Sequence, residues 1–239
     1  MKLTKRERMA TTMFVALAGV VLPRLAQAHI TVASGPGTAN TTQEVSFGVA
    51  HGCSGTDTAS VRLEIPAGVT SVRPMASDFG KPTVETDATG AVTAVVWTKA
   101  DADVLASDIA YYKLVVRMKV PDKAFTTIYF PAHQTCRGSD GGTTVVDWIG
   151  LPTTPATDAA APEPAPALVI VPAHKTGWNK LVAPIAVTDL VTYFGDAQIV
   201  WKGTAAFSAN TTTTDLIKTT SGVTALSSIS ANDELWVRY

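Results

Sequence analysis

Charged residues are scarce in this chain, and neither a basic run nor a long apolar run occurs beyond its first 28 residues. Asp, Glu, Lys and Arg account for 16% of the 239 residues, and apolar residues account for 46%. This apolar content excludes a disordered chain, and the low charge content is unlike that of a coiled coil. The lack of a basic run argues against nucleic-acid binding. We therefore expect a globular protein with no nucleic-acid partner.

The usual sequence signatures of hydrolases, metalloproteases and nucleotide-binding enzymes are also missing. The chain contains no G-x-S-x-G, no H-E-x-x-H and no phosphate-binding glycine loop. Ser, His and Asp are present, but no spacing among them selects a catalytic triad. We therefore expect that the protein is not an enzyme.

The first 28 residues show the three parts of a secretory signal peptide. A basic start is followed by an apolar run from Met13 to Leu22 and by a small-x-small cleavage motif that ends at Ala28. The alternative is a buried N-terminal helix, and the run is too short for a permanent membrane span of about 20 residues. Cleavage after Ala28 removes five basic residues and one acidic residue, which changes the formal net charge from −1 to −5. We expect a periplasmic or secreted protein without stable membrane insertion after cleavage.

The chain has two cysteines, Cys53 and Cys136. In an oxidising compartment two such residues are expected to pair, and the disulfide would close a loop of about 80 residues, contributing roughly 4 kcal/mol. A metal site that uses cysteine is the alternative, although lone cysteines without CxxC spacing do not form a zinc knuckle.

From residue 29 to about residue 151 the sequence alternates between apolar and polar residues with a period of two, which is typical of strands with one buried face. Turn signals rich in Gly, Pro and Asp separate these runs at spacings of about ten residues. The pattern predicts an all-β, antiparallel β-sandwich of immunoglobulin or cupredoxin type. The expected strands include residues 44–49, 60–65, 91–97, 112–120, 127–130 and 168–171. Residues 100–110 are expected to form a turn or two of helix, with Asp101, Asp103 and Asp108 solvated.

The second part of the chain follows a segment rich in Pro and Ala. We expect an extended loop or linker over residues 153–166, inside a sandwich domain of residues 29–172. Residues 173–239 then predict a small α+β module. Its expected helices are residues 187–194 and 215–218, and its expected strands are residues 198–201 and 234–239.

Cleavage after Ala28 would make His29 the first residue of the mature chain. A free α-amine and the Nδ1 atom of the same histidine can chelate one metal ion in a six-membered ring. The α-amine titrates near pH 7.7–8.0, so a metal can displace its proton at neutral pH. Nitrogen ligands in a tetragonal arrangement favour Cu(II). The alternative is that a histidine follows the cleavage motif by chance.

Six short segments, in their order along about residues 29–172, resemble the YcnI-like copper-binding domains. These segments are 29–32 (HITV), 47–53 (FGVAHGC), 63–69 (LEIPAGV), 72–75 (VRPM), 129–136 (YFPAHQTC) and 146–149 (VDWI). Residues 177–239 resemble a tail found on proteobacterial members of that family.

The resemblance implies an extracytoplasmic β-sandwich that binds copper through its N-terminal histidine, a carboxylate near the end of the second strand and a tryptophan. His29 and Trp148 match the histidine and the tryptophan. The carboxylate has no counterpart, because the stretch reads His51-Gly52-Cys53 and the next acid is Asp57. We therefore expect His51 to replace it.

Each of the other candidates also has a plain structural interpretation. Met75 offers a thioether suited to Cu(I) but is equally explained by packing. His133 is a candidate for a position beside the ligands, or else a residue at a surface strand end. His51 could simply flank the disulfide, Trp148 could be core, and His174 is expected in a loop.

The expected function is copper binding in the cell envelope, in copper trafficking, storage or resistance. The expected partners are the copper ion and another copper-trafficking protein. One alternative is a copper-dependent oxidative enzyme, since two histidines are also the ligand set of polysaccharide monooxygenases. Such an enzyme needs an aromatic surface for its polymer, and the sequence indicates no exposed aromatic cluster. The other alternative is a structural or adhesion β-module without metal.

Overall fold

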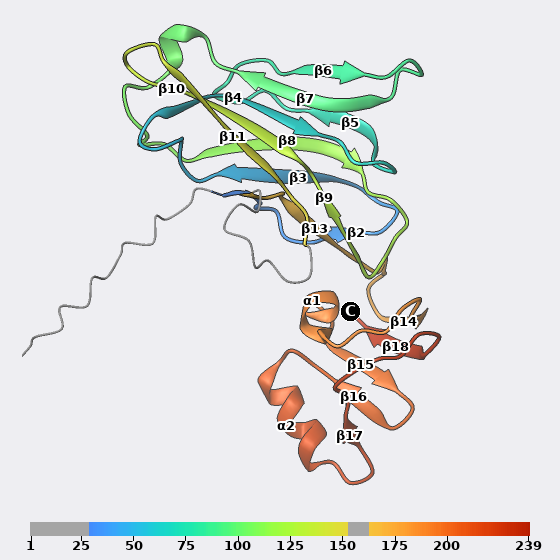
Figure 1. Ribbon diagram of the computed structural model, residues 1–239. Helices are drawn as coiled ribbons and strands as arrows, with labels where there is room; N and C mark the ends of the chain where they lie inside the picture. Colours follow the sequence, from blue (N-terminus) through green and yellow to red (C-terminus); the bar gives the residue numbers. More distant parts are fainter. Residues whose placement is uncertain (1–28, 153–162) are drawn as a thin grey trace, which may run out of the picture.

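The computed structural model describes residues 29–152 and 163–239 (Figure 1). The expected signal peptide and residues 153–162 of the expected linker lie outside the described residues. Strands dominate the part before residue 172, and the predicted antiparallel β-sandwich followed by a small α+β module is confirmed. No helix among the described residues is long and apolar enough to cross a membrane.

Two sheets face each other in the sandwich, and a third closes one end (Figure 1). The four-stranded sheet has the order β1 (Ile30–Val32), β3 (Thr42–Val49), β8 (Tyr112–Lys119), β5 (Thr70–Pro74). The six-stranded sheet has the order β12 (Glu163–Pro164), β11 (Thr143–Gly150), β10 (Ala132–Arg137), β4 (Asp57–Glu64), β7 (Val92–Thr98), β6 (Thr83–Thr86). The third sheet contains β2 (Gly37–Thr38), β13 (Ala167–Val171) and β9 (Thr126–Tyr129).

The alternation in the sequence determines which side chains enter the core. Along β8, every second residue is buried while its neighbours are exposed or half-buried, as a strand with one face in a core requires. The inward residues of both sheets form one continuous cluster, with Phe47 and Phe130 in edge-to-face contact at 5.1 Å between ring centroids. This core holds the two sheets in a fixed relation, so residues at their edges are held in place as well.

Two local expectations need correction. The turn of helix expected in residues 100–110 is present only as a three-residue 3-10 helix, η1 (Asp101–Asp103), and the rest of the segment is not helical. The reason is long-range hydrogen bonding, since the N–H of Leu105 bonds to the carboxylate of Asp57 and the N–H of Asp108 bonds to the carbonyl of Gly55. In the expected linker, Glu163 and Pro164 form strand β12, which pairs in parallel with β11.

The C-terminal module contains a five-stranded sheet and two short helices. The sheet has the order β14 (Trp178–Val182), β18 (Glu234–Arg238), β15 (Ile199–Lys202), β16 (Ala205–Phe207), β17 (Thr224–Ala225). Helix α1 (Leu190–Phe194) begins three residues later than expected, because Asp189 caps its N-terminus. Helix α2 (Thr211–Thr219) begins four residues earlier than expected, because Asn210 caps it before a run of threonines.

The sandwich and the C-terminal module meet around Phe125, which precedes β9. Its side chain is 3% exposed and belongs to the apolar cluster of the C-terminal module. Its ring lies 5.3 Å from that of Tyr193 and 5.7 Å from that of Phe194, both in α1. Helix α1 accordingly lies on the side of the module that faces the sandwich (Figure 1).

Candidate metal site at the edge of the sandwich

His29 and Trp148 lie together although they come from different sheets. His29 immediately precedes the edge strand β1, which pairs with β3 so that Ile30 lies opposite Val49. Trp148 lies in β11 of the six-stranded sheet, and the centroids of its indole and the His29 imidazole are 5.5 Å apart, at an interplanar angle of 47°. Trp148 is only 3% exposed. Its indole can therefore cover one side of the His29 imidazole from solvent.

Gln134 connects Trp148 to the loop that carries His51. Its Oε1 accepts a hydrogen bond of 3.0 Å from the indole N–H of Trp148. Its Nε2 donates to the backbone carbonyl of His51 at 2.9 Å and to the hydroxyl of Thr58 at 2.8 Å. Because the indole N–H can only donate, it fixes the orientation of the amide. Gln134 was not predicted from the sequence, although a polar residue at an inward position of an alternating strand is a usable signal.

His51 follows the end of β3, close to His29, which precedes the paired strand β1. Continuing the β1–β3 register by one step places His29 opposite Ala50, the neighbour of His51. The Nδ1 atom of His51 lies 2.9 Å from the carbonyl oxygen of Gly52. A carbonyl can only accept, so Nδ1 carries the hydrogen in this contact, and the neutral imidazole then has its lone pair on Nε2. That is the tautomer in which His51 can bind a metal through Nε2.

The loop after His51 is held tightly. Cys53 and Thr56 exchange backbone hydrogen bonds of 3.1 and 3.0 Å around Ser54 and Gly55, both of which have positive φ, as in a two-residue hairpin turn. A Cβ atom at Gly52 would lie 1.7 Å from the carbonyl oxygen of Thr56, so only glycine fits there.

A disulfide joins this loop to the six-stranded sheet. The predicted pairing of Cys53 with Cys136 of β10 is confirmed, with the Cα atoms 5.7 Å apart. Cys136 lies two residues beyond Gln134 on the same inward face of β10. The loop of His51 is therefore attached to β10 through the disulfide and through Gln134.

Two carboxylates that the sequence analysis did not assign to the site lie near its residues. Asp108 was expected to be solvated, but its side chain is 10% exposed and its Oδ2 lies 3.5 Å from Nδ1 of His51. A carboxylate in this position orients an imidazole and increases its basicity toward a metal. Glu163 lies opposite Trp148 in the β11–β12 register and is half-buried. Neither could be assigned from the sequence, because Asp108 lies in a loop and Glu163 in strand β12, both far along the chain from His29 and His51.

Asp57, the first acid after His51, is committed elsewhere. It is fully buried and forms an ion pair of 2.6 Å with Lys99. The hydroxyl of Tyr112 donates to its other oxygen at 2.6 Å. Burial raises the pKa of Asp57, but the hydrogen bonds from Lys99, Tyr112 and the backbone of Leu105 outweigh burial and lower the pKa below its ordinary value. Asp57 therefore stays ionised as the partner of a buried cation.

The structure does not bring Met75 to His29. Met75 directly follows β5, which lies at the opposite edge of the four-stranded sheet from β1. Strands β3 and β8 lie between these edges, which places them about 14 Å apart at ordinary strand spacing. Met75 is 45% exposed, and its carbonyl accepts a hydrogen bond from the indole of Trp97.

His133 faces away from Trp148 and Gln134. It lies on the outer face of the six-stranded sheet, with Nδ1 2.7 Å from Asp147 and Nε2 3.3 Å from Glu64. Arg62 continues this row by contacting Glu64 at 2.7 Å, and its hydrogen bond lowers the pKa of Glu64. His133 thus belongs to a row of surface charges across neighbouring strands.

The remaining histidine, His174, stacks on Tyr239 at 3.6 Å in the C-terminal part of the chain. Across residues 29–152 and 163–239, no three side chains of His, Cys, Asp or Glu converge as a metal site. A site at His29 would therefore depend on a backbone donor, the α-amine, in addition to side chains.

The chain is similar to proteins of solved structure, whereas no curated protein matches it. An uncharacterized protein from Nocardia farcinica, described as having an immunoglobulin-like fold, is 25% identical with a TM-score of 0.47, and the match covers 59% of this chain and 97% of that one. A protein from Corynebacterium diphtheriae whose name suggests a membrane anchor is 11% identical with a TM-score of 0.30, over 56% of this chain and 36% of that one. A family model matches residues 29–170. The chain therefore belongs to the family described as a domain of unknown function, DUF1775.

Proposed function

We propose that the mature chain is an extracytoplasmic copper-binding protein that captures Cu(II) at His29 for trafficking, storage or resistance. The observation that carries this proposal is the contact between His29 and Trp148, 5.5 Å apart across the two sheets. Gln134 supports it by linking Trp148 to the loop of His51. Contact with Trp148 holds the His29 imidazole in place, as a metal ligand requires.

The ligand roles follow from the donor atoms. The α-amine and Nδ1 of His29 supply two nitrogens, and Nε2 of His51, just after the adjacent end of β3, supplies a third. Copper prefers such nitrogen donors. Trp148 covers one side and slows exchange with water. Asp108 orients His51, and Glu163 is the carboxylate best placed by strand register to add an oxygen donor beside Trp148.

Export from the cytoplasm is consistent with both the N-terminal copper ligand and the disulfide. A signal peptide exports the chain and its removal creates the α-amine of His29. Disulfides such as Cys53–Cys136 persist in oxidising compartments. We propose the periplasm or the secreted state as the location, with the copper ion and a copper-trafficking protein as partners.

The test is an electron paramagnetic resonance titration of the chain beginning at His29 with Cu(II). We expect one stoichiometric signal with nitrogen hyperfine structure. Acetylation of the His29 α-amine, or the substitution His29→Ala, should abolish that signal, because each removes a chelating nitrogen from the same ring. His174→Ala is the matched control, since its imidazole stacks on Tyr239 away from Trp148, and it should leave the signal unchanged.

An unchanged spectrum in the N-acetylated protein would exclude the N-terminal amine and overturn the proposal. Gln134→Met tests the supporting link, since it leaves Trp148 and the His51 carbonyl without their shared partner. We expect it to weaken copper binding less than His29→Ala does. Oxygen consumption with a reductant would instead favour the oxidative enzyme, and transfer to an apo-protein would favour trafficking.

A further inference from the structure

The outer face of the C-terminal sheet carries an exposed row of tryptophans. Trp178 and Trp236 are 52% and 50% exposed, and Trp201 is half-buried. The three line an open hollow of about 430 Å³. They are three of the five tryptophans in the chain. The sequence alone revealed no such cluster, because these tryptophans are far apart in the chain and meet only through strand pairing.

Strand pairing explains how these residues meet. Along β18, Glu234, Trp236 and Arg238 are exposed, whereas Leu235 and Val237 between them are buried in the apolar cluster that includes helix α1. Trp236 lies opposite Trp201 on β15 and opposite Lys180 on β14. Trp178 lies opposite Arg238, one diagonal step from Trp236. Since directly opposite residues are about 5 Å apart and diagonal ones about 7–8 Å apart, the three indoles form a continuous strip across three strands.

The strip is too small for a stable protein interface. Indoles that are already partly covered, each able to bury 150–250 Å² in full, offer on the order of 300 Å² together, against about 800 Å² from each partner in a standard interface. An exposed aromatic strip of this size fits a ligand with flat apolar surfaces better than a second protein.

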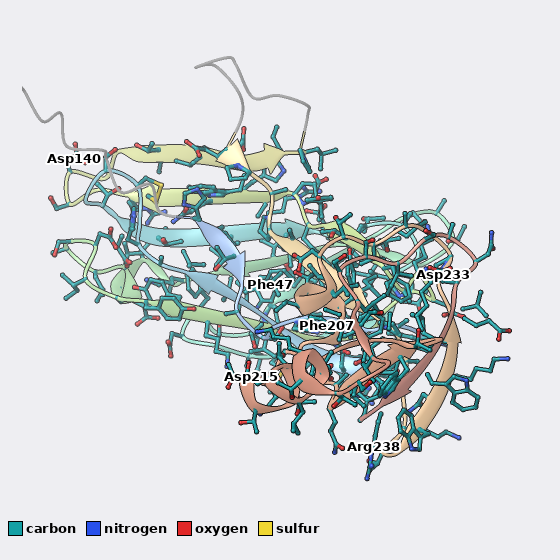
Figure 2. All side chains as sticks on the ribbon, turned by 90° about the horizontal axis from the view of Figure 1, so that it is seen from below. Phe47, Asp140, Phe207, Asp215, Asp233 and Arg238 are labelled. Carbon is teal, nitrogen blue, oxygen red and sulfur yellow. A yellow bond between two sulfur atoms is a disulfide. The ribbon has the colours of Figure 1, made fainter. Side chains whose placement is uncertain are left out.

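Charge on the same face favours an anionic ligand over a cationic one. Lys180 and Glu234 form an ion pair of 2.9 Å and cancel one another. Arg238 lies with its guanidinium 6.0 Å from the ring of Trp178, and no carboxylate of the described part of the chain lies within ion-pair distance of it. Figure 2 shows Arg238 at the outer edge of the molecule, far from Phe47 in the sandwich. The strip therefore has one uncompensated positive charge, which repels a quaternary ammonium group and attracts a carboxylate.

We propose that this face binds the carboxylate-bearing glycan strands of peptidoglycan. The faces of pyranose rings present C–H groups with partial positive charge, which complement the negative faces of the indoles. Consecutive sugar rings of an extended strand would stack along Trp178, Trp236 and Trp201. A lactyl or peptide carboxylate would pair with Arg238. Export of the chain supports this choice of glycan, because it places the module in the compartment of the cell wall.

The experiment is co-sedimentation of the mature full-length chain with purified peptidoglycan sacculi, with intrinsic tryptophan fluorescence as a second readout. We expect the chain to sediment with the sacculi and Trp236→Ala to weaken binding roughly tenfold, the size of a central aromatic contact. Arg238→Gln should weaken binding and reduce its salt dependence. Leu216→Ala is the matched control, because Leu216 is an exposed apolar residue of the same module on helix α2, and it should bind normally.

Three outcomes would overturn the proposal. The first is equal sedimentation of the parent chain and the Trp236→Ala variant. The second is retention on an uncharged glycan such as cellulose without retention on sacculi. The third is a dimer in sedimentation velocity that Trp236→Ala dissociates, which would assign the strip to self-association. Because Trp236 is half-exposed, its replacement should leave the melting temperature nearly unchanged, and that measurement separates loss of binding from loss of fold.

Discussion

At the scale of single residues, the sandwich contains a buried charge that only its partners make tolerable. Lys99 and Asp57 are 2% and 0% exposed in their side chains and lie 2.6 Å apart. The ammonium of Lys99 also donates to the hydroxyl of Tyr112 and lies 3.9 Å from the centre of its ring. Burial, together with the hydrogen bond to Asp57, raises the pKa of Tyr112, so Tyr112 stays a neutral donor. Asp57 and Tyr112 are therefore each fixed in one protonation state at neutral pH.

Removing one partner of this pair should be costly. Lys99→Met leaves Asp57 as an uncompensated buried anion, and we expect the free energy of unfolding to fall by about 3–5 kcal/mol. The double variant Asp57→Asn/Lys99→Met carries no buried charge and should regain most of that loss. Urea titration followed by tryptophan fluorescence at pH 7 measures both, and equal stability of parent and Lys99→Met would show that the pair is solvated.

The same pair gives a pH dependence of defined sign. The pKa of Asp57 is lower in the folded state than in the unfolded chain, so its stabilising effect is complete above about pH 4. As the pH falls further, the unfolded state binds a proton first, and stability is lost toward the folded pKa. The double variant should lose less stability between pH 5 and pH 3 than the parent does. An identical acid limb in both proteins would contradict this assignment.

At the scale of secondary-structure elements, the alternating sequence sufficed for the sandwich and for six of its strands, but it did not identify β5, β6, β10 or β11. It also could not show where helices α1 and α2 begin at their caps, nor that Glu163 and Pro164 would add an edge strand to β11. The site was only partly predictable for the same reason. His29 and Trp148 could be identified from the sequence, whereas Gln134 and Asp108 act through contacts with residues far away in the chain. Local patterns carry no information about such pairings.

The disulfide anchors the loop between β3 and β4 to strand β10. Replacing both Cys53 and Cys136 by serine should cost roughly 4 kcal/mol on the chain-entropy model and lower Tm by on the order of 10 °C. It should also weaken copper binding, because His51 lies two residues from Cys53 and loses one of its two attachments to β10. Calorimetry and Cu(II) titration of the serine variant measure the two effects without a thiol reductant that would bind copper. Lower Tm with unchanged copper affinity would show that Gln134 alone positions the loop.

At the scale of the whole molecule, Phe125 couples the sandwich to the C-terminal module. Phe125 directly precedes strand β9 of the sandwich, but its side chain is buried in the apolar cluster of the module, against Tyr193 and Phe194. Its φ of 65° is unfavourable for a non-glycine residue. A strained and buried aromatic residue persists only where its surroundings hold it. The two proposed sites therefore belong to parts of the chain that Phe125 helps to hold in contact, together with the packing of helix α1 against β13.

We expect Phe125→Ala to separate the two parts thermodynamically. Loss of a buried Phe costs about 3–5 kcal/mol, and this loss falls on the junction and leaves the core around Phe47 intact. Calorimetry of the mature chain should then change from one transition to two, with the C-terminal module melting first. Phe125→Leu, which keeps an apolar side chain at the junction, should retain one transition. Between the two transitions the Phe125→Ala protein should still bind Cu(II) at His29 but no longer sediment with sacculi. Joint loss of both activities at one temperature would mean that the two sites depend on a single cooperative fold.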